Sequence, residues 1–265
     1  MRIATWNING LRARREYLLR WLAERQPDVA GLQELKMTDE AFPFDAFEEI
    51  GYRVVTHGQK AWNGVAILSR RPMEVTRVGL PGQEALGARL VSARVGRLSF
   101  TTIYVPNGKD LAHEDFPRKL AWLDTLAQYL QEHLHPRDAA IVCGDFNLCP
   151  AALDSWRGEA AQGQIFHTDE ERGRFQRLLA PPCALVDLYR ERFPDTQAFS
   201  WWDYRGGSFP KGQGLRLDFL LATPALAAHL DSVTIDREYR KKKDGLTPSD
   251  HAPVVAEFSI PDDPG

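Results

Sequence analysis

The stretch AAIVCGDFN, residues 139–147, is an apolar run that ends in a glycine, an aspartate and an asparagine. A short apolar run bounded by turn-forming residues predicts a β-strand. Similar runs occur on both sides of it along the chain. They are RIATWNI (2–8), VAGLQ (29–33), GVAILS (64–69), ARLVSARV (88–95), LSFTTIYV (98–105), ALVDLY (184–189), AFSWW (198–202), LDFLLA (217–222), SVTID (232–236) and PVVAEFSI (253–260).

Helical patterns lie between these runs. Residues 115–133 carry apolar side chains at spacings of three and four, which predicts a helix with one face on the core. These side chains are Phe116, Leu120, Leu123, Ala127 and Leu130. Further helices are expected near residues 14–25 and 170–179. The inventory predicts an α/β fold in which two mixed β-sheets pack together with helices outside them.

Length and composition bound the organisation. The 265 residues fit one large α/β domain, and no Pro/Gly/Ser-rich linker or repeat divides them. With 43% hydrophobic and 26% charged residues, disorder as the main state is excluded. We expect a single domain over residues 1–260 and a short C-terminal tail over residues 261–265.

Other function classes lose support from composition. No apolar run reaches the roughly 20 residues of a membrane span, and MRIATWNING does not resemble a signal peptide, so a cytoplasmic protein without a membrane partner is expected. The net charge of −3 excludes a globally basic nucleic-acid coat. Three cysteines without C-x-x-C spacing suggest neither a disulfide framework nor a zinc knuckle.

Acidic, amide and imidazole side chains stand beside the predicted strands. Strand ends are where ligands converge in many α/β folds. An Asp-x-Asn pair after a strand is usually turn chemistry by itself, but one shared position for all these residues argues for a common site. They are Asn7, Glu34, Tyr104, Asn107, Asp145, Asn147, Asp218, Asp250 and His251.

These side chains have the chemistry of a hard divalent cation. Mg²⁺, or Mn²⁺ in its place, prefers carboxylate and amide oxygens and leaves positions open for water and phosphate. No Walker A or G-x-G-x-x-G pattern follows a strand, so no nucleotide cofactor is expected, and no serine lies in a nucleophile elbow. A metal with carboxylates, amides and an imidazole suits phosphodiester hydrolysis.

At these residues the sequence resembles the exonuclease III family of DNA-repair nucleases, within the endonuclease/exonuclease/phosphatase superfamily. Eight segments match in order and cover nearly the whole chain. They are WNINGLRAR (6–14), PDVAGLQELK (27–36), NGVAILSR (63–70), TIYVPNG (102–108), GDFNLCP (144–150), FSWWDYR (199–205), GLRLDFLLA (214–222) and PSDHAPV (248–254).

The resemblance implies a four-layer α/β sandwich with the site at one edge of two packed sheets. It implies a Mg²⁺-dependent enzyme that nicks double-stranded DNA 5′ to an abasic site and removes nucleotides or blocking groups from 3′ ends. The resemblance does not decide whether Asp145 or His251 is the general base. It also leaves undecided the balance of the activities, any preference for RNA strands and the number of metal ions. A monomer is expected.

Roles follow from the matching motifs. By resemblance, Glu34 is the metal ligand, with Asn7 beside it and Asp250 nearby. Asp145 and Asn147 position or activate the attacking water. Tyr104 and Asn107 contact the scissile phosphate, and Asp218 orients His251, which stabilises the phosphoryl charge. Asn9 departs from the aspartate of some relatives.

Substrate contacts are expected in the segments that follow. Trp201 and Leu217 match positions that wall a pocket for a flipped-out abasic sugar, whereas Trp202 is expected in the core. Arg216 and Lys109 are expected to bind the substrate. The basic run at residues 237–243 is either a solvated face or a phosphate contact.

Two alternatives remain open. One is a noncatalytic nucleic-acid-binding regulator on the same scaffold, which would be expected to lose parts of GDFN or SDH, both intact here. The other is a different phosphoesterase of the superfamily, acting on lipid or inositol phosphates or secreted as a deoxyribonuclease.

Overall fold

Two six-stranded sheets build the framework of this computed structural model, which describes residues 1–259. The tail expected at residues 261–265, like residue 260, lies outside the described residues. The strand order is β11-β12-β1-β2-β4-β3 in the first sheet and β5-β6-β7-β8-β10-β9 in the second. Each sheet is mixed, because β1 pairs parallel to β2 and β7 parallel to β8, while the other pairs are antiparallel.

The strands have the following bounds. The first sheet contains β1 (Arg2–Asn7), β2 (Val29–Gln33), β3 (Arg53–His57), β4 (Val65–Ser69), β11 (Leu230–Ile235) and β12 (Val254–Phe258). The second sheet contains β5 (Glu74–Val78), β6 (Leu90–Val95), β7 (Leu98–Tyr104), β8 (Ala140–Asp145), β9 (Val186–Asp187) and β10 (Asp218–Ala222).

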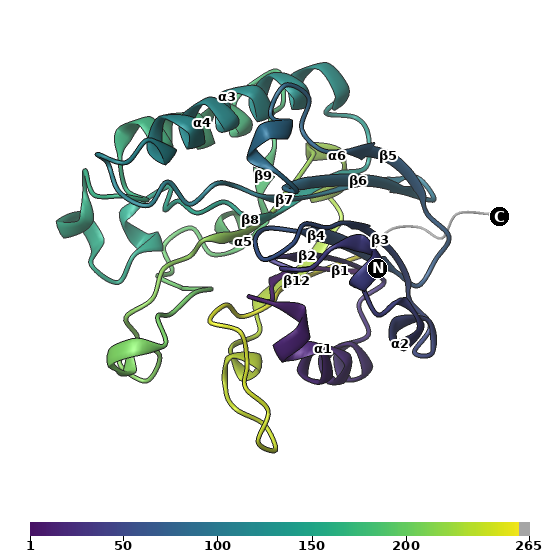
Figure 1. Cartoon of the computed structure of the whole chain (residues 1–265). Helices are drawn as coiled ribbons and strands as arrows, with labels where there is room; N and C mark the ends of the chain where they lie inside the picture. Colours follow the sequence, from purple (N-terminus) through teal and green to yellow (C-terminus); the bar gives the residue numbers. More distant parts are fainter. Residues whose placement is uncertain (260–265) are drawn as a thin grey trace.

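Helices cover the outer face of each sheet (Figure 1). The first sheet carries α1 (Leu11–Arg25) and α2 (Phe44–Glu48), and the second carries α3 (Asp115–His133) and α4 (Asp169–Leu179). The shorter helices are α5 (Leu188–Arg192) and α6 (Pro224–Ala227). Helix, sheet, sheet and helix form the four layers that the resemblance implied.

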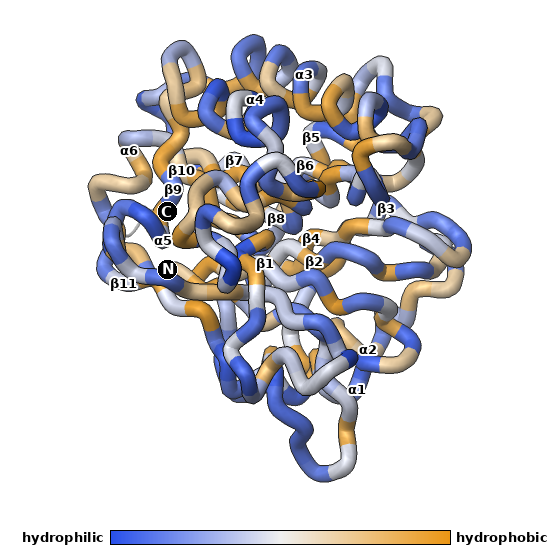
Figure 2. The backbone as a smooth tube through the Cα atoms, turned by 90° about the vertical axis from the view of Figure 1, so that its left-hand side faces the viewer, coloured by the Kyte–Doolittle hydropathy of each residue, from blue (hydrophilic) through white to orange (hydrophobic). Residues whose placement is uncertain are grey.

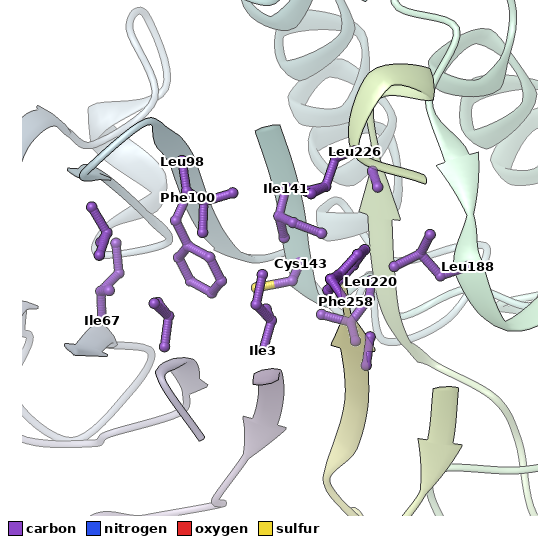
Figure 3. Packing of buried hydrophobic residues seen from close by; sticks show 14 of the residues in the cluster. Ile3, Ile67, Leu98, Phe100, Ile141, Cys143, Leu188, Leu220, Leu226 and Phe258 are labelled. Carbon is purple, nitrogen blue, oxygen red and sulfur yellow. The ribbon is translucent and has the colours of Figure 1, made fainter. Parts of the chain in front are cut away.

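Three cores hold the layers together. Figure 3 shows the central one, where Ile3 and Ile67 of the first sheet face Phe100, Ile141 and Cys143 of the second. A second cluster joins the first sheet to α1 and α2, and a third joins the second sheet to α3 and α4. In Figure 2 the hydrophobic colour accordingly gathers on the strands and the inner faces of the helices.

The irregular 3₁₀ turns lie mainly in the loops after β8 and around the end of the chain. They are η1 (Asp39–Ala41), η2 (Glu84–Leu86), η3 (Ala152–Asp154), η4 (Gly158–Ala161), η5 (Arg205–Gly207) and η6 (Arg237–Arg240). In the described part of the chain, no helix has the length and apolar character needed to cross a membrane.

Some predicted elements differ from the structure. AFSWW is not a strand: its backbone hydrogen bonds to Leu215, Asp250 and Ala252 form only isolated bridges, in which Trp201 pairs with Leu215 and His251. ALVDLY contains only the two-residue β9, after which the chain turns into α5. The patterns missed β3 and β5, which lie at sheet edges, and every residue of β5 is exposed.

Candidate active site

The predicted site residues converge where β1, β2, β7 and β8 end. Asn7 and Tyr104 close β1 and β7, and Glu34 follows β2. Asp145 closes β8 and pairs in register with Asp218, the first residue of the antiparallel β10. Since the parallel pairs β1–β2 and β7–β8 end at the same edge of the sandwich, side chains far apart in sequence meet there.

A glycine immediately before Asp145 makes this strand end possible. Gly144 has φ +143°, and a Cβ atom added to it would lie 1.9 Å from the carbonyl oxygen of Ile103 on β7. No residue with a side chain fits so close to the neighbouring backbone. Gly144 therefore lets β8 stay paired with β7 up to the carboxylate of Asp145.

Asn7 links the two carboxylates that face each other across the sheets. Its buried Nδ2 donates hydrogen bonds of 2.8 Å to Oε1 of Glu34 and 2.8 Å to Oδ2 of Asp145, while its Oδ1 accepts from the backbone N–H of Asn9. Asn7 thus presents its amide nitrogen to both carboxylates and acts here as their bridge.

His251 is held between two carboxylates. Its Nδ1 lies 2.8 Å from Oδ2 of Asp218, and its Nε2 lies 3.8 Å from Oδ2 of Asp145. The hydroxyl of Ser200 donates to the same Asp218 oxygen at 2.6 Å and accepts from the backbone N–H groups of Leu217 and Asp218 at 3.0 Å each. Ser200 therefore fixes the carboxylate that orients the imidazole.

Burial and charge shift the protonation of this pair. Burial raises the pKa of Asp145 to about 7, and the carboxylates of Asp218 and Glu34 act in the same direction against the opposite effect of His251. Burial alone would lower the pKa of His251. The charges of Asp218 and Asp145 outweigh this effect and raise the pKa to about 10. Near neutral pH the imidazole is therefore protonated, and Asp145 is poised to exchange a proton.

Amide and phenol groups line the side of the site formed by β7 and β8. Nδ2 of Asn107 donates to Oδ1 of Asn147 at 3.2 Å, and the backbone N–H of Asn147 donates to Oδ1 of Asp145 at 2.9 Å. Burial raises the pKa of Tyr104 well above its usual value, and Glu34 and Asp145 add to the effect. The Tyr104 hydroxyl thus remains a neutral hydrogen-bond donor.

Asp250 lies on the opposite side, joined to two other residues of the site. Its Oδ2 accepts from Nε1 of Trp201 at 3.0 Å and its Oδ1 from Nδ2 of Asn9 at 2.9 Å. Burial would raise its pKa, but the charge of His251 and these two hydrogen bonds lower it. Asp250 is thus ionised and holds the indole of Trp201 beside the site.

The donor set fits a divalent cation. Among the described residues, one donor atom each from Glu34, Asp145 and His251 lies within 4.8 Å of the others. The ammonium of Lys36 lies 2.8 Å from Oε2 of Glu34 and offsets the charge of that carboxylate. Glu34 and Asp145 offer the hard oxygen ligands that Mg²⁺ or Mn²⁺ prefers. Asn7 and Asp250, also predicted as metal ligands, use the atoms described above for hydrogen bonds within the protein.

Of the four residues predicted to contact the substrate, Leu217 and Trp201 lie in one apolar cluster and Lys109 lies at the surface. Leu217 is buried and packs in one cluster with Leu215 and Cys149, against which Trp201 and Phe166 lie. Lys109 is exposed, and its ammonium pairs with Asp115 at 2.8 Å. It remains available at the rim of the site.

Arg216 does not match its predicted contact with the substrate. Its side chain is 1% exposed, with Nε at 2.6 Å from Asp154 and the terminal nitrogens at 3.0 and 2.8 Å from the two carboxylate oxygens of Asp187. A guanidinium enclosed by two carboxylates has no face for a DNA phosphate. Arg216 instead anchors the strand entry that carries Leu217 and Asp218.

Sequence reasoning missed Ser200 and Lys36, which contact the predicted residues directly. Both lie inside matching segments, FSWWDYR and PDVAGLQELK. The structure adds a signal that the sequence does not carry, backbone strain, which clusters at functional sites. Positive φ angles of ordinary residues recur around the site, at Asn9, Glu34, Lys36, Lys109, Asn147 and Phe166.

The basic run near the end of the chain divides into two parts. Arg240 is buried and donates to the backbone carbonyls of Asp250 and Trp202, at 3.1 Å each. Lys241 and Lys242 are exposed on the loop that follows η6, which Figure 1 shows in yellow projecting beyond α1. Arg240 therefore stabilises the site, and the exposed lysines remain candidates for phosphate contacts.

Comparisons with known proteins agree with this geometry. The family model described as endonuclease/exonuclease/phosphatase matches residues 4–251. Exodeoxyribonuclease III of Haemophilus influenzae is 38% identical over 271 residues, covering 97% of this chain and all of that protein.

Solved structures give the same result. An AP endonuclease from Archaeoglobus fulgidus superposes with a TM-score of 0.93 at 34% identity, covering 98% of this chain and all of that one. A 3′ phosphatase from Neisseria bound to a product DNA hairpin has a TM-score of 0.92 at 36% identity, covering 98% of this chain and all of that one. The likeness therefore extends over the whole sandwich, including the edge where the site lies.

Proposed function

Since the chain belongs to the endonuclease/exonuclease/phosphatase family, we propose that it is a metal-dependent DNA-repair nuclease that hydrolyses the phosphodiester 5′ to abasic sites and also processes 3′ ends. The observation that carries the proposal is the chain of contacts from Asp218 through His251 to Asp145 beside Glu34. Relatives of similar length and fold are named for these activities on DNA.

In the proposed reaction Asp145 is the general base. A carboxylate whose pKa is raised to about 7 takes a proton from water more readily than an ordinary aspartate. The Asn147 amide, anchored by its Nδ2 bond to the Val105 carbonyl at 2.9 Å, orients that water for in-line attack. His251 is a poor base in this setting, because its raised pKa keeps it protonated.

Protonated His251 stabilises the negative charge that develops on the phosphoryl oxygens. Asp218 keeps the imidazole charged and oriented, and the Tyr104 hydroxyl and Asn107 amide are placed to donate to the phosphate. Glu34 would hold Mg²⁺, with Mn²⁺ as a substitute, and a bound ion would neutralise phosphate charge and polarise the phosphoryl group. Side chains of this protein supply the general base, the orientation of the water and the hydrogen bonds to the phosphate.

A specialised 3′-end phosphodiesterase is the second candidate. Phe166, in the left-handed region with φ 72°, packs with Trp201 against the cluster that contains Leu217. Trp201 and Leu217 are the residues predicted to wall the pocket for an extruded sugar. In such a pocket a phenyl ring would reduce the room for an abasic nucleotide that continues into DNA on both sides. A 3′-terminal nucleotide is less restricted.

The two candidates differ in the substrates they cleave. The test uses end-labelled duplexes carrying a tetrahydrofuran abasic analogue, a recessed 3′-hydroxyl end or a 3′-phosphate, each with Mg²⁺ and with EDTA. Cleavage 5′ to the analogue that EDTA abolishes supports the abasic-site nuclease. Activity on 3′ ends alone supports the second candidate, and folded protein inactive on all three with Mg²⁺ or Mn²⁺ contradicts both.

Oligomeric state and location are part of the proposal. We infer a monomer, because all the residues of the proposed mechanism come from one chain. Size-exclusion chromatography with light scattering should give a mass near 30.0 kDa, and a stable dimer would contradict it. The cytoplasmic location remains a prediction that fractionation of the source cells would test.

A further inference from the structure

Lys119 on α3 is a fully buried cation that the proposed mechanism does not use. Its side chain and that of Glu171 on α4 are both 0% exposed. The ammonium donates to the backbone carbonyl of Asn147 at 2.6 Å, to that of Asn107 at 3.3 Å and to Oε1 of Glu171. Two of its three acceptors therefore belong to the proposed catalytic residues.

The chemistry of the ammonium matches this arrangement. A lysine ammonium has three N–H donors and no acceptor, so three acceptors satisfy it completely. Burial lowers the pKa of Lys119, while Glu171 acts in the opposite direction. No other side chain offers three donors from one atom at the end of a slender stem, so the arrangement selects lysine.

The carbonyl contacts tie two loops together beneath the site. Asn107 lies between β7 and α3, and Asn147 follows β8, and their side chains are joined at 3.2 Å. The first loop approaches Lys119 so closely that a Cβ atom on Gly108, at φ +86°, would lie 3.1 Å from the lysine Cδ. Any movement of the ammonium would therefore shift the backbones of both asparagines.

Glu171 extends the connection to the loop before α4. Its Oε1 also accepts from the backbone N–H of Phe166 at 3.2 Å, and its Oε2 accepts from the N–H and hydroxyl of Thr168 at 3.1 and 2.8 Å. The ammonium also lies 4.8 Å from the centre of the Phe166 ring. Lys119 thus contacts both the loops of Asn107 and Asn147, on the proposed phosphate side of the site, and Phe166, on the proposed sugar side.

We propose that Lys119 is a positioning residue that, paired with Glu171, holds the backbones of Asn107 and Asn147 in the geometry needed for phosphodiester hydrolysis. The proposal rests on the proposed function for its effect on turnover. The competing explanation is that Lys119 only neutralises the buried Glu171 carboxylate and so contributes to stability alone.

A double variant separates the two explanations. Lys119→Met leaves Glu171 buried and unpaired, which should lower the Tm by about 10 °C. Adding Glu171→Gln removes that charge and keeps a residue suited to the capping box at Thr168, so the Tm should largely recover. The carbonyls of Asn107 and Asn147 remain without their ammonium in both variants.

The expected kinetic result is a split between kcat and KM at a temperature where every variant is folded. Both Lys119 variants should lose about 10- to 100-fold in kcat with KM within about 3-fold of wild type, because misplaced groups impair the chemical step. The matched control is Asp124→Asn, which breaks the ion pairs of Asp124 with Arg174 and Arg177 between the same two helices and should keep full activity. If the double variant regains kcat together with Tm, the positioning role is wrong.

Hydrogen exchange tests, without any substrate, whether Lys119 holds the loops of Asn107 and Asn147 in place. The amides of Val105, Lys109 and Asn147 are bonded within these loops, to Asp145, Asn107 and Asp145 respectively. Their exchange should accelerate at least several-fold in both Lys119 variants and stay unchanged in Asp124→Asn. Unchanged exchange in the double variant would overturn the proposal. If wild type cleaves no DNA, the proposed function fails, and hydrogen exchange still decides the role of Lys119.

Discussion

Nδ1 of His251 lies 2.8 Å from Oδ2 of Asp218, and both side chains are buried. This contact fixes the orientation of the imidazole, so that Nε2 points toward Asp145 on the neighbouring strand. It also raises the pKa of the ring, against the effect of burial. The division of labour between a protonated imidazole and a basic carboxylate follows from it.

Asp218→Asn should lower the pKa of His251 toward its usual value near 6.5. The amide keeps the shape but removes the charge that favours imidazolium. The wild-type pKa, raised to about 10, and that of the variant can be measured by NMR titration of the ring in metal-free protein. An unchanged pKa would show that Asp218 does not control the charge of the ring.

The same shift has a consequence for stability. Because the folded pKa of His251 lies above its unfolded value, the stabilisation is full below about pH 6.5 and is lost as pH rises toward 10. The difference in free energy of unfolding between wild type and Asp218→Asn should therefore shrink over that range. Urea titrations of the metal-free proteins at several pH values measure it, and a difference that grows with pH would contradict the assignment.

Asp145→Asn should reduce kcat by about 10³-fold or more and leave DNA affinity within a few-fold, because the loss falls on proton transfer. Single-turnover cleavage measures the first quantity and fluorescence anisotropy in EDTA the second. Equal activity in the variant would remove Asp145 from the mechanism, and an equal loss of binding would make its role one of substrate affinity.

Trp201→Ala should weaken the preference for abasic over intact duplex by about 10-fold, with a smaller effect on 3′-end hydrolysis. Trp201→Phe is the matched control, since it keeps an aromatic wall but removes the hydrogen bond to Asp250. Competition between the two duplexes measures the preference. If Trp201→Phe is as impaired as Trp201→Ala, the hydrogen bond rather than the ring is what matters.

Arg216→Met should destabilise the protein by about 3–5 kcal/mol, because it leaves the carboxylates of Asp154 and Asp187 buried without their shared partner. Urea unfolding measures the loss. DNA affinity of the folded variant should stay unchanged, whereas Lys109→Ala should lower it and reduce the salt dependence by about one ion. Weaker DNA binding by folded Arg216→Met would restore the predicted contact with substrate.

Divalent ions should stabilise the folded protein by mass action. Adding Mg²⁺ to the metal-free wild type should raise its Tm, because an ion at 100 times its dissociation constant adds about 2.7 kcal/mol to the free energy of unfolding. Glu34→Gln, which removes a carboxylate from the acidic cluster, should show little of this effect. An equal shift in both proteins would place the ion elsewhere.

The spacing of apolar residues alone was enough to predict several elements. The strands at residues 139–145 and 217–222 and the helix at residues 115–133 were confirmed, because apolar spacing is a local property. Matching motifs at the strand ends predicted Asp145, Asp218 and His251, and the structure brings them together. Local patterns and motif matches were thus enough to predict the class of fold and the kinds of side chain at the site.

Tertiary packing sets which charged groups are paired with each other inside the protein and which stay accessible. Arg216 and Trp201 come from neighbouring motifs, yet one is enclosed by Asp154 and Asp187 and the other lies beside Asp250. In the sequence, Lys119 has the pattern of an ordinary polar residue on a helix. Folding brings its ammonium to two asparagine carbonyls and to Glu171. Such partners lie far along the chain, so only the packing of the layers, and not local spacing, sets the role of these charges.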